Sequence, residues 1–217
     1  MADVGWSVDA PLGRDDDLAD AAHGADLLLI AVPDAAIADV AEAIEPDSGC
    51  VVAHVSGSLG LAPLSKHPRR AVLHPLVALP DAERGAAALR GAWFGLAADG
   101  DPLADDVVRA LGGTAVHIPD HAWARYHAAA VIASNHLVAL LGQVERIAAT
   151  LGIPLEAFLD LAEGTLANVR ALGPADALTG PVRRGDLATV ERHLAALPDD
   201  ERAAYQALSE EAARLCR

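Results

Sequence analysis

The first half of the chain alternates short apolar runs with segments of helical periodicity. The clearest run is Ala25–Asp34 (ADLLLIAVPD), in which residues 27–32 carry no polar alternation. Such a run predicts a strand buried on both faces of a parallel sheet. Asp34 is placed to cap a helix over 34–44, whose apolar positions recur at three and four. Ligands bind beyond the carboxyl ends of such strands, so the loop after this strand is the first candidate site.

Similar alternation continues as far as residue 118. An acidic turn or short helix is predicted at 15–22, and a loop with about one helical turn at 80–89. A capped helix that starts with proline is predicted at 101–111. Further strands are predicted at 6–12, 50–55, 70–73, 92–97 and 114–118.

Beyond Pro119 the pattern predicts helices alone. Strands alternating with helices, followed by helices only, predict two domains, residues 1–119 and 120–217. The predicted fold class is therefore α/β with an all-α second domain. The expected helices cover 121–151, 154–172, 186–197 and 199–215, with a loop at 173–184.

Composition narrows the possible functions. The 217 residues are 53% hydrophobic, enough for a real core, and the formal net charge is −15 with a single lysine, Lys66. This acidity argues against a nucleic-acid or anionic-membrane partner, both of which need a basic face. Cys50 and Cys216 suggest neither a disulfide framework nor a metal site. The cytoplasm is the default expectation for location.

The stretch 126–144 is the most membrane-like part of the sequence, since it has no Asp, Glu, Lys or Arg. It nevertheless contains several groups that are costly to bury in lipid. We therefore expect a helix buried in protein and no membrane span. The groups are His127, Ser134, Asn135, His136 and Gln143.

Five motifs carry a resemblance to a known family. Their order and spacing resemble a bacterial family of predicted oxidoreductases that joins a Rossmann-like domain to a helical domain of unknown function. This family is similar to 6-phosphogluconate dehydrogenase, prephenate dehydrogenase and pyrroline-5-carboxylate reductase. The motifs are ADLLLIAVPD (25–34), HVSGSLG (54–60), HPL (74–76), YHAAAVIASN (126–135) and LTGPVRRGD (178–186).

One element of the resemblance has no counterpart here. Such families begin with a strand, a G-x-G-x-x-G turn that holds the cofactor pyrophosphate, and a helix, and the sequence contains no such turn. Gly5 resembles the end of that first helix. The hypothesis is an incomplete Rossmann sheet lacking this unit. The strand at 27–32 would then expose an edge, so we expect poor solubility or association.

His74 is the main catalytic candidate. It ends a predicted strand in the motif HPL and resembles the His-Pro of prephenate dehydrogenases, where the histidine acts on the substrate hydroxyl. A histidine there can exchange the proton that accompanies hydride transfer. The alternative is a histidine that only hydrogen-bonds the end of the strand.

The loop after the strand at 50–55 supplies a second set of candidates. Ser56 is assigned a catalytic role and Ser58 a substrate-binding role, because their hydroxyls can bond a substrate carboxylate or the cofactor carboxamide. Gly57 permits close approach of the cofactor. An ordinary Ser/Gly turn is the alternative, and His54 is expected to be structural.

The resemblance also assigns residues outside these loops. His127 and Asn135 share a helix face with other polar groups and are candidates for substrate binding, as is Thr179 in the loop between helices. A satisfied core network is the alternative for the helix, and a surface loop for Thr179. Related enzymes are commonly dimers whose helical domains interlock, which implies a homodimer here.

The cofactor implied is NADP or NAD. Arg14 lies where a nucleotide ribose would be and would suit the extra phosphate of NADP, although the aspartates beside it weaken that interpretation. Val32, Pro33 and Asp34 would border the nicotinamide. The function expected is oxidation or reduction of a small polar metabolite, for example one bearing a carboxylate. The alternative is a non-catalytic dimeric binding protein that does not hold a dinucleotide.

Overall fold

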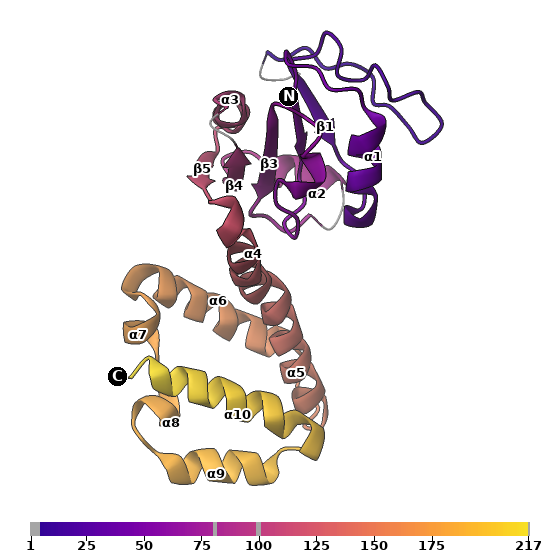
Figure 1. Cartoon of the computed structure of the whole chain (residues 1–217). Helices are drawn as coiled ribbons and strands as arrows, with labels where there is room; N and C mark the ends of the chain where they lie inside the picture. Colours follow the sequence, from indigo (N-terminus) through magenta and orange to yellow (C-terminus); the bar gives the residue numbers. More distant parts are fainter. Residues whose placement is uncertain (1–4, 80–81, 99–100, 217) are drawn as a thin grey trace. The chain divides into compact units, whose positions relative to one another are not determined.

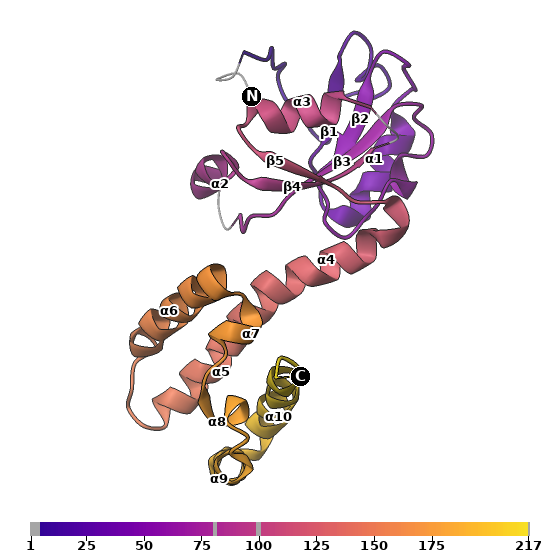
Figure 2. The same cartoon turned by 90° about the vertical axis from the view of Figure 1, so that its left-hand side faces the viewer.

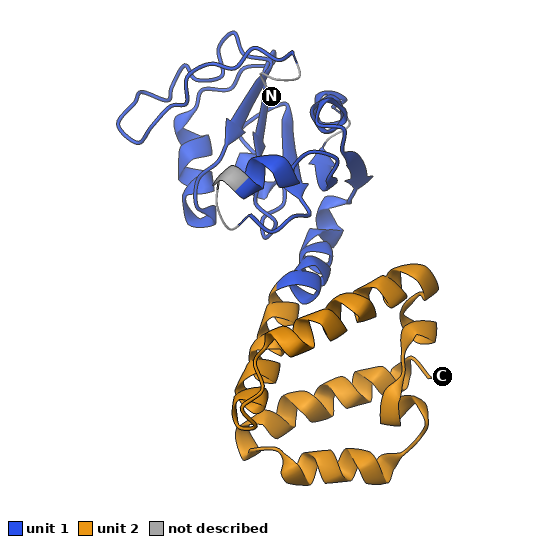
Figure 3. Ribbon diagram, turned by 180° about the vertical axis from the view of Figure 1, so that it is seen from behind, with its two compact units in different colours: residues 1–134 blue, residues 135–217 orange. Residues whose placement is uncertain are grey.

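The computed structural model of the 217-residue chain describes residues 5–79, 82–98 and 101–216. The chain divides into two compact units, residues 1–134 and 135–217, which are coloured separately in Figure 3. Each unit is described by itself below. The division falls later than the boundary at 119/120 that the sequence predicts, because the helix that follows Pro119 packs Trp123 into the core of unit 1.

Unit 1 contains a five-stranded sheet whose strands lie in chain order (Figure 1). All neighbouring strands are parallel except β3 and β4, which are antiparallel. The sheet therefore matches the predicted α/β class with a mostly parallel sheet. The strands are β1 (Leu27–Ile30), β2 (Val51–His54), β3 (Arg70–Pro75), β4 (Trp93–Ala98) and β5 (Thr114–His117).

Helices α1 (Ile37–Ala43) and α3 (Leu103–Ala110) cover opposite faces of this sheet (Figure 2). Strand β2 is buried on both faces, and its residues alternate between the two sides: Val51 packs with α3, and Val52 packs with α1. The remaining helical segments of unit 1 are η2 (Asp34–Ala36), η3 (Ala62–Leu64), α2 (Ala82–Ala88), η4 (Asp120–Ala122), α4 (Trp123–Val131) and the first part of a π-helical segment, η5 (Ile132–His136).

The strand predicted at 6–12 is wrong. Residues 6–12 have no regular structure, and most of them are exposed, although Trp6 packs partly against the core. A strand forms only where a neighbour completes its hydrogen bonds, and none of the described strands lies beside this segment. An apolar pattern alone therefore misleads here.

Strand β1 is less buried than predicted. Leu29 is 48% exposed, and β1 pairs with β2 alone, so it lies at one edge of the described sheet. The expectation of burial on both faces is wrong, while the expectation of an open edge at this strand is confirmed. An edge strand presents unpaired backbone groups to solvent. The expected poor solubility or association stays a prediction.

Two local predictions need correction. Asp34 does not cap the helix that follows β1: it lies in the first turn, and its side chain binds elsewhere. The segment predicted as a loop with one helical turn contains α2, a helix of seven residues, while Pro80 and Asp81 lie outside the described residues. The helix expected at 101–111 is present as α3, and the Asp101 carboxylate accepts the Leu103 N–H as the prediction of a cap requires.

Unit 2 is entirely helical in its described residues. The helix predicted over 121–151 is present as α4, the π-helical turn η5 and α5, which follow one another without a break. The expected loop at 173–184 instead contains two short helices. The helices of unit 2 are α5 (Leu137–Ala149), α6 (Glu156–Leu172), α7 (Pro174–Ala177), α8 (Gly180–Arg183), α9 (Leu187–Ala196) and α10 (Asp199–Arg214).

The apolar side chains of unit 2 mostly face outward. Ala148 is its one buried hydrophobic residue among those described, whereas Val138, Leu151 and Leu161 are each at least 67% exposed. Helix α6 makes its main contacts with the short helix α7. Polar groups join α5 to the start of α10: Gln143 donates to the Glu201 carbonyl, and the Glu201 carboxylate is bound by two nitrogens of one arginine, Arg146.

The expectation of a protein-buried helix at 126–144 is wrong for the single chain. Residues 120–149 form one helix that by length and composition could cross a membrane, but only 6% of its most apolar window is buried in the chain. Polar Ser134, Asn135 and His136 lie in the middle of this helix.

Candidate active site

Three strand ends in unit 1 bring the main predicted residues together. Asp34 follows β1, Ser56–Ser58 follow β2, and His74 lies near the end of β3. Strands β1 to β3 are parallel neighbours, so their carboxyl ends meet at one edge of the sheet. Helix α4 adds Trp123, Tyr126 and His127. We call these eight residues the site cluster: Asp34, Ser56, Gly57, Ser58, His74, Trp123, Tyr126 and His127.

The two serines of the site cluster form a hydrogen-bonded chain that ends at Asp34. Ser58 Oγ donates to Asp34 Oδ2 at 2.5 Å, and the Ser56 and Ser58 hydroxyls are 3.2 Å apart. Since the Ser58 proton goes to Asp34, Ser56 is the donor between the serines. Ser56 Oγ also accepts the backbone N–H groups of Ser58 and Leu59. Both hydroxyl protons are thus already used within the protein.

This chain explains the charge state of Asp34. The hydrogen bond from Ser58 lowers the pKa of the Asp34 carboxyl below its ordinary value, against a smaller opposing effect of desolvation. Asp34 is therefore ionised near neutral pH. It is exposed and can accept further hydrogen bonds, as expected of a group that holds a cofactor hydroxyl.

His74 lies among aromatic rings of α4. Its Nδ1 is 2.8 Å from Tyr126 Oη, and its ring meets those of Trp123, Tyr126 and His127 edge to face, with centroids 5.6–6.5 Å apart. Burial lowers the pKa of the His74 imidazole, with a smaller lowering effect from His127. His74 is therefore neutral near pH 7.

Gly57 lets two imidazole rings pack directly against the loop after β2. A Cβ at Gly57 would lie 2.5 Å from His74 Nε2 and 2.7 Å from His127 Cδ2, too close for any side chain. The place of a side chain is thus taken by the rings of His74 and His127, at the end of a sheet where ligands bind. The absence of a side chain at Gly57 is therefore what brings both histidines to this strand end.

Gly95 performs a similar task behind Tyr126. It lies in β4 opposite His74, and a Cβ there would be 2.3 Å from Tyr126 Oη. The phenol therefore reaches His74 only because β4 has no side chain at this position. Burial raises the pKa of the Tyr126 phenol, so the tyrosine is neutral.

Two polar side chains, His54 and Asp120, fix the loop after β2. His54 is fully buried; its Nδ1 accepts the Ser56 N–H at 3.2 Å and its Nε2–H donates to the Gly60 carbonyl at 3.0 Å. Asp120 Oδ1 accepts the Leu61 N–H at 2.8 Å, which ties the start of α4 to the same loop. His54 is thus a structural residue, in agreement with the sequence-based expectation.

Five predicted site residues lie outside the site cluster. Val32 is half-buried and packs against the core on the side of α1, and Pro33 is the exposed residue just before η2. Arg14 is exposed in the turn 13–16. The cofactor-binding roles of these three residues stay predictions. Asn135 belongs to η5 and unit 2, where it is exposed. Thr179 lines an apolar pocket within unit 2. The substrate-binding roles of Asn135 and Thr179 stay predictions.

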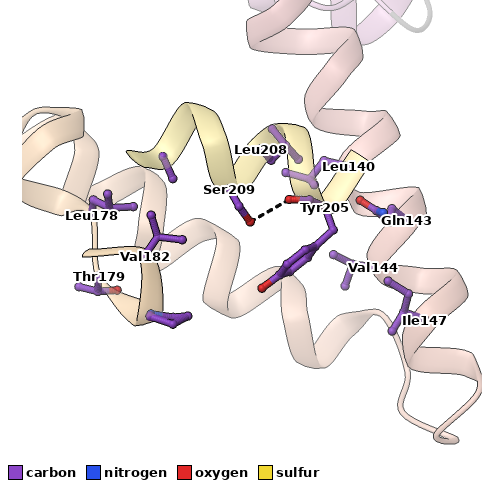
Figure 4. A pocket seen from close by; sticks show the side chains of 12 residues that line it. Leu140, Gln143, Val144, Ile147, Leu178, Thr179, Val182, Tyr205, Leu208 and Ser209 are labelled. Carbon is purple, nitrogen blue, oxygen red and sulfur yellow. Dashed lines mark hydrogen bonds between the residues drawn. The ribbon is translucent and has the colours of Figure 1, made fainter. Parts of the chain in front are cut away.

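That pocket has a volume of about 360 Å³ (Figure 4). Figure 4 shows side chains of α5, the α7–α8 segment and α10 around it, with Tyr205 directed across the space between Val144 and Val182. The Tyr205 hydroxyl is 2.6 Å from His193 Nδ1, so its polar atom is already partnered. Because unit 2 has almost no buried core, we interpret this apolar pocket as a gap between its helices rather than as a ligand site.

The sequence did not single out Tyr126, Trp123 or Gly95. Tyr126 stands next to His127 in a motif that carries the resemblance. A tyrosine beside a candidate histidine could have been proposed from the sequence as a hydrogen-bonding residue of the site. Gly95 within an otherwise buried apolar strand also signals close approach of another group.

Comparisons with known proteins now identify the family. The model described as "Domain of unknown function (DUF2520)" matches residues 93–212, which is more than half of the chain. This chain belongs to the DUF2520 family. A Rossmann-like domain model matches residues 13–84, so both parts of the predicted resemblance are confirmed. A search of curated proteins gives no match.

Solved structures with the same fold include three informative cases. Protein TM1727 from Thermotoga maritima is 29% identical with a TM-score of 0.75, and the match covers 87% of this chain and 77% of that one. A candidate NADP oxidoreductase, BF3122 from Bacteroides fragilis, is 21% identical with a TM-score of 0.72, covering 91% and 79%. Pyrroline carboxylate reductase from Plasmodium falciparum, solved with NADP bound, is 12% identical with a TM-score of 0.60, covering 96% and 86%. These matches confirm the predicted fold class.

Proposed function

We propose that this DUF2520 protein is an NAD(P)-dependent oxidoreductase of a small polar metabolite, with His74 at its reaction centre. The observation that carries the proposal is the convergence of three strand ends on His74, which packs against Gly57 in the loop after β2. The names of two structural relatives, an NADP oxidoreductase and an NADP-bound reductase, support the cofactor class, with NADP preferred over NAD.

The residues present fit one end of such a cofactor. Asp34 is exposed and has a carboxylate that can accept ribose hydroxyls at the carboxyl ends of the parallel strands. The sequence holds no G-x-G-x-x-G turn for the pyrophosphate, so tight binding of the whole dinucleotide needs groups beyond those of the site cluster. When bound, the nicotinamide supplies or accepts the hydride.

The site cluster indicates which substrate atoms fit beside His74. Its side chains carry one formal negative charge, on Asp34, and no lysine or arginine. Both serine hydroxyl protons are used internally, so the serines offer no free donor to a substrate carboxylate. A carboxylate on the substrate would therefore lie away from this cluster. The reacting group itself is an uncharged carbonyl or imine, held by a hydrogen bond from His74.

The exposed apolar surface of unit 2 suggests a protein partner. Unit 2 exposes large apolar side chains, and the stretch 126–144 carries no charge in a chain of net charge −15. A second copy offers the same uncharged surface and needs no opposite charge to bind. We infer a homodimer in which the helical units cover each other, in a cytoplasmic protein.

The test of function uses purified protein, NADPH and a panel of small carbonyl and imine compounds. NADPH affinity is followed by fluorescence and turnover by its absorbance. His74→Ala should lower turnover about 100- to 10,000-fold with little change in NADPH affinity. Lys66→Ala, a substitution of a residue whose amine binds Glu42 away from the site, is the control and should leave turnover unchanged.

The outcomes separate this proposal from its rival. NADPH binding with turnover that depends on His74 supports the oxidoreductase. Equal turnover by the wild type and His74→Ala removes His74 from the mechanism. Failure of NADPH to bind, with a helical dimer intact, supports the non-catalytic binding protein instead.

A further inference from the structure

The two nitrogens of His74 have different surroundings. Nδ1 faces the Tyr126 hydroxyl at 2.8 Å. Nε2 lies against the Gly57 backbone and, among the residues that the structure describes, makes no hydrogen bond, yet it is not one of the buried unpartnered atoms. The protein thus uses one nitrogen and leaves the other without a partner, so the position of the ring proton decides what His74 can do.

The hydroxyl of Tyr126 sets that position. Among the residues that the structure describes, His74 Nδ1 is the one side-chain partner of the phenol. The backbone of Gly95 also binds Oη and favours its ionised form, so Gly95 is a donor there. The Tyr126 side chain is half-buried, and Nδ1 is the acceptor that lies within hydrogen-bond distance of its hydroxyl. The O–H therefore donates to Nδ1, and the neutral ring carries its proton on Nε2.

His54 shows the same arrangement, and here the direction of the hydrogen bond to Nδ1 is certain because the partner is a backbone N–H, which can only donate. Its Nδ1 accepts a backbone N–H, that of Ser56, so its proton is on Nε2 and is donated to the Gly60 carbonyl. Both ring nitrogens of His54 are thereby used within the protein. His74 differs in one respect: no acceptor in the described part of the chain binds its Nε2–H.

We propose that Tyr126 is a positioning residue that holds His74 as a neutral Nε2–H donor, aimed at the substrate atom that gains negative charge. This inference rests on the proposed function and narrows its substrate class. The substrate atom must have a lone pair, as a carbonyl oxygen or the nitrogen of a neutral imine does. A protonated iminium nitrogen has none and is excluded as the group beside Nε2.

The groups that face His74 agree with a neutral ring. His127 and Tyr126 face it from α4, and the carboxylate of Asp34 lies on the loop after β1. Burial lowers the pKa of His74 more than the Asp34 carboxylate raises it. A neutral imidazole that donates a hydrogen bond stabilises charge that develops on a substrate oxygen during reduction.

The test is a long-range proton–nitrogen NMR spectrum of protein labelled with ¹⁵N in histidine. His74→Gln identifies the signals of His74 in the full-length protein. In the wild type, Nε2 should show the shift of a protonated nitrogen and Nδ1 that of an unprotonated one. Tyr126→Phe keeps the ring that packs on Trp123 but removes the hydroxyl, so His74 should become a mixture of tautomers.

A matched control exists in unit 2. His193 and Tyr205 form a second pair, with Nδ1 and Oη 2.6 Å apart, on the surface. Tyr205→Phe should change the signals of His193 and leave those of His74 as in the wild type. A wild-type His74 protonated on Nδ1, or an unchanged His74 spectrum in Tyr126→Phe, overturns the proposal.

Kinetics provide a second readout that keeps the two proposals separate. Tyr126→Phe should lower kcat about 10- to 100-fold with unchanged NADPH affinity, as expected for loss of a residue that orients another. The NMR result needs no substrate. The expected tautomer without any turnover would count against the oxidoreductase alone, whereas turnover that depends on His74 together with the wrong tautomer would count against Tyr126 alone. Near-ultraviolet circular dichroism of the variant checks that its aromatic packing is retained.

Discussion

The two units of this protein bury their apolar residues to very different extents. Unit 1 has a sheet covered on both faces, with Val51, Val52, Leu64 and Leu96 fully inaccessible to solvent. Among the described residues of unit 2, Ala148 alone is a buried hydrophobic residue. Conformational entropy opposes folding equally in both, and buried apolar area is the main term that offsets it. Unit 1 therefore holds the elements of a stable fold, whereas unit 2 needs a second surface.

The two units also differ in how their polar side chains are connected by hydrogen bonds. In unit 1 the serines, His54 and Asp120 hold the loop after β2 through a connected set of hydrogen bonds, and this loop shapes the site. In unit 2 the ion pair between Arg146 and Glu201 joins α5 to α10. This ion pair does not involve α6. The site is thus built on the part of the chain that has its own core.

The largest expected effect comes from breaking the proposed dimer. Leu161, 67% exposed on α6, is replaced by Asp; Glu163→Asp on the same helix is the control. The charged variant should become monomeric and lose much of its helical signal, because a desolvated carboxylate is costly at an interface. Analytical ultracentrifugation and circular dichroism measure both effects. A wild type that is monomeric with full helicity would remove the need for a partner.

Truncating one leucine in each unit sharpens the comparison. Leu64→Ala in unit 1 removes a fully buried side chain and should cost about 2–5 kcal/mol of unfolding free energy. Leu166 is 54% exposed in the single chain. If a second copy covers it, Leu166→Ala should cost a similar amount in denaturant unfolding, and the cost should depend on protein concentration. A cost within about 0.5 kcal/mol, as for an ordinary surface site, would contradict the covered face.

The stability of unit 1 should fall as the pH falls below about 6.5. Burial lowers the pKa of His54 and of His74 below their ordinary value of 6.5, so the unfolded chain binds more protons in this range. Each histidine contributes at most about 1.4 kcal/mol per pH unit. Denaturant unfolding between pH 5 and pH 7.5 measures the slope. His54→Gln should reduce it.

The smallest expected effect concerns Asp34. Ser58→Ala removes the hydrogen bond that lowers the pKa of this carboxyl, so that pKa should rise toward its ordinary value of 3.8. The carbon chemical shift of the carboxyl group, followed during an acid titration, reports the change. Ser65→Ala, at an exposed position on another loop, should leave the titration of Asp34 as it is. No movement in Ser58→Ala would show that the serine chain does not hold Asp34.

Much of unit 1 could be predicted because its strands are local signals. Residues 50–55 and 92–97 are mostly apolar, and the structure has strands at both. The strand predicted at 6–12 failed because a strand also depends on a neighbour, which the sequence pattern does not report. The meeting of the loop after β2 with His74, through Gly57, follows from the rule that parallel strands end at one edge.

The role of Tyr126 could not be predicted in the same way. Its hydroxyl reaches His74 across Gly95, and the register that places Gly95 opposite His74 is a property of the antiparallel pair β3–β4. Likewise, the exposure of the helix at 126–144 depends on tertiary packing, so apolar composition alone suggested burial. The sequence predicted most helices and strands of unit 1, but it did not predict which residues far apart in the chain would contact each other.

The central claim is that the site cluster is a centre for hydride transfer between a nicotinamide cofactor and a carbonyl or imine. The most direct test supplies NADPH deuterated at the transferable position of the nicotinamide and analyses the products by mass spectrometry. We predict deuterium on the substrate carbon with the wild type and a loss of about 100-fold or more with His74→Ala. A protein that binds NADPH yet yields no deuterated product, or equal labelling by both proteins, would contradict the claim.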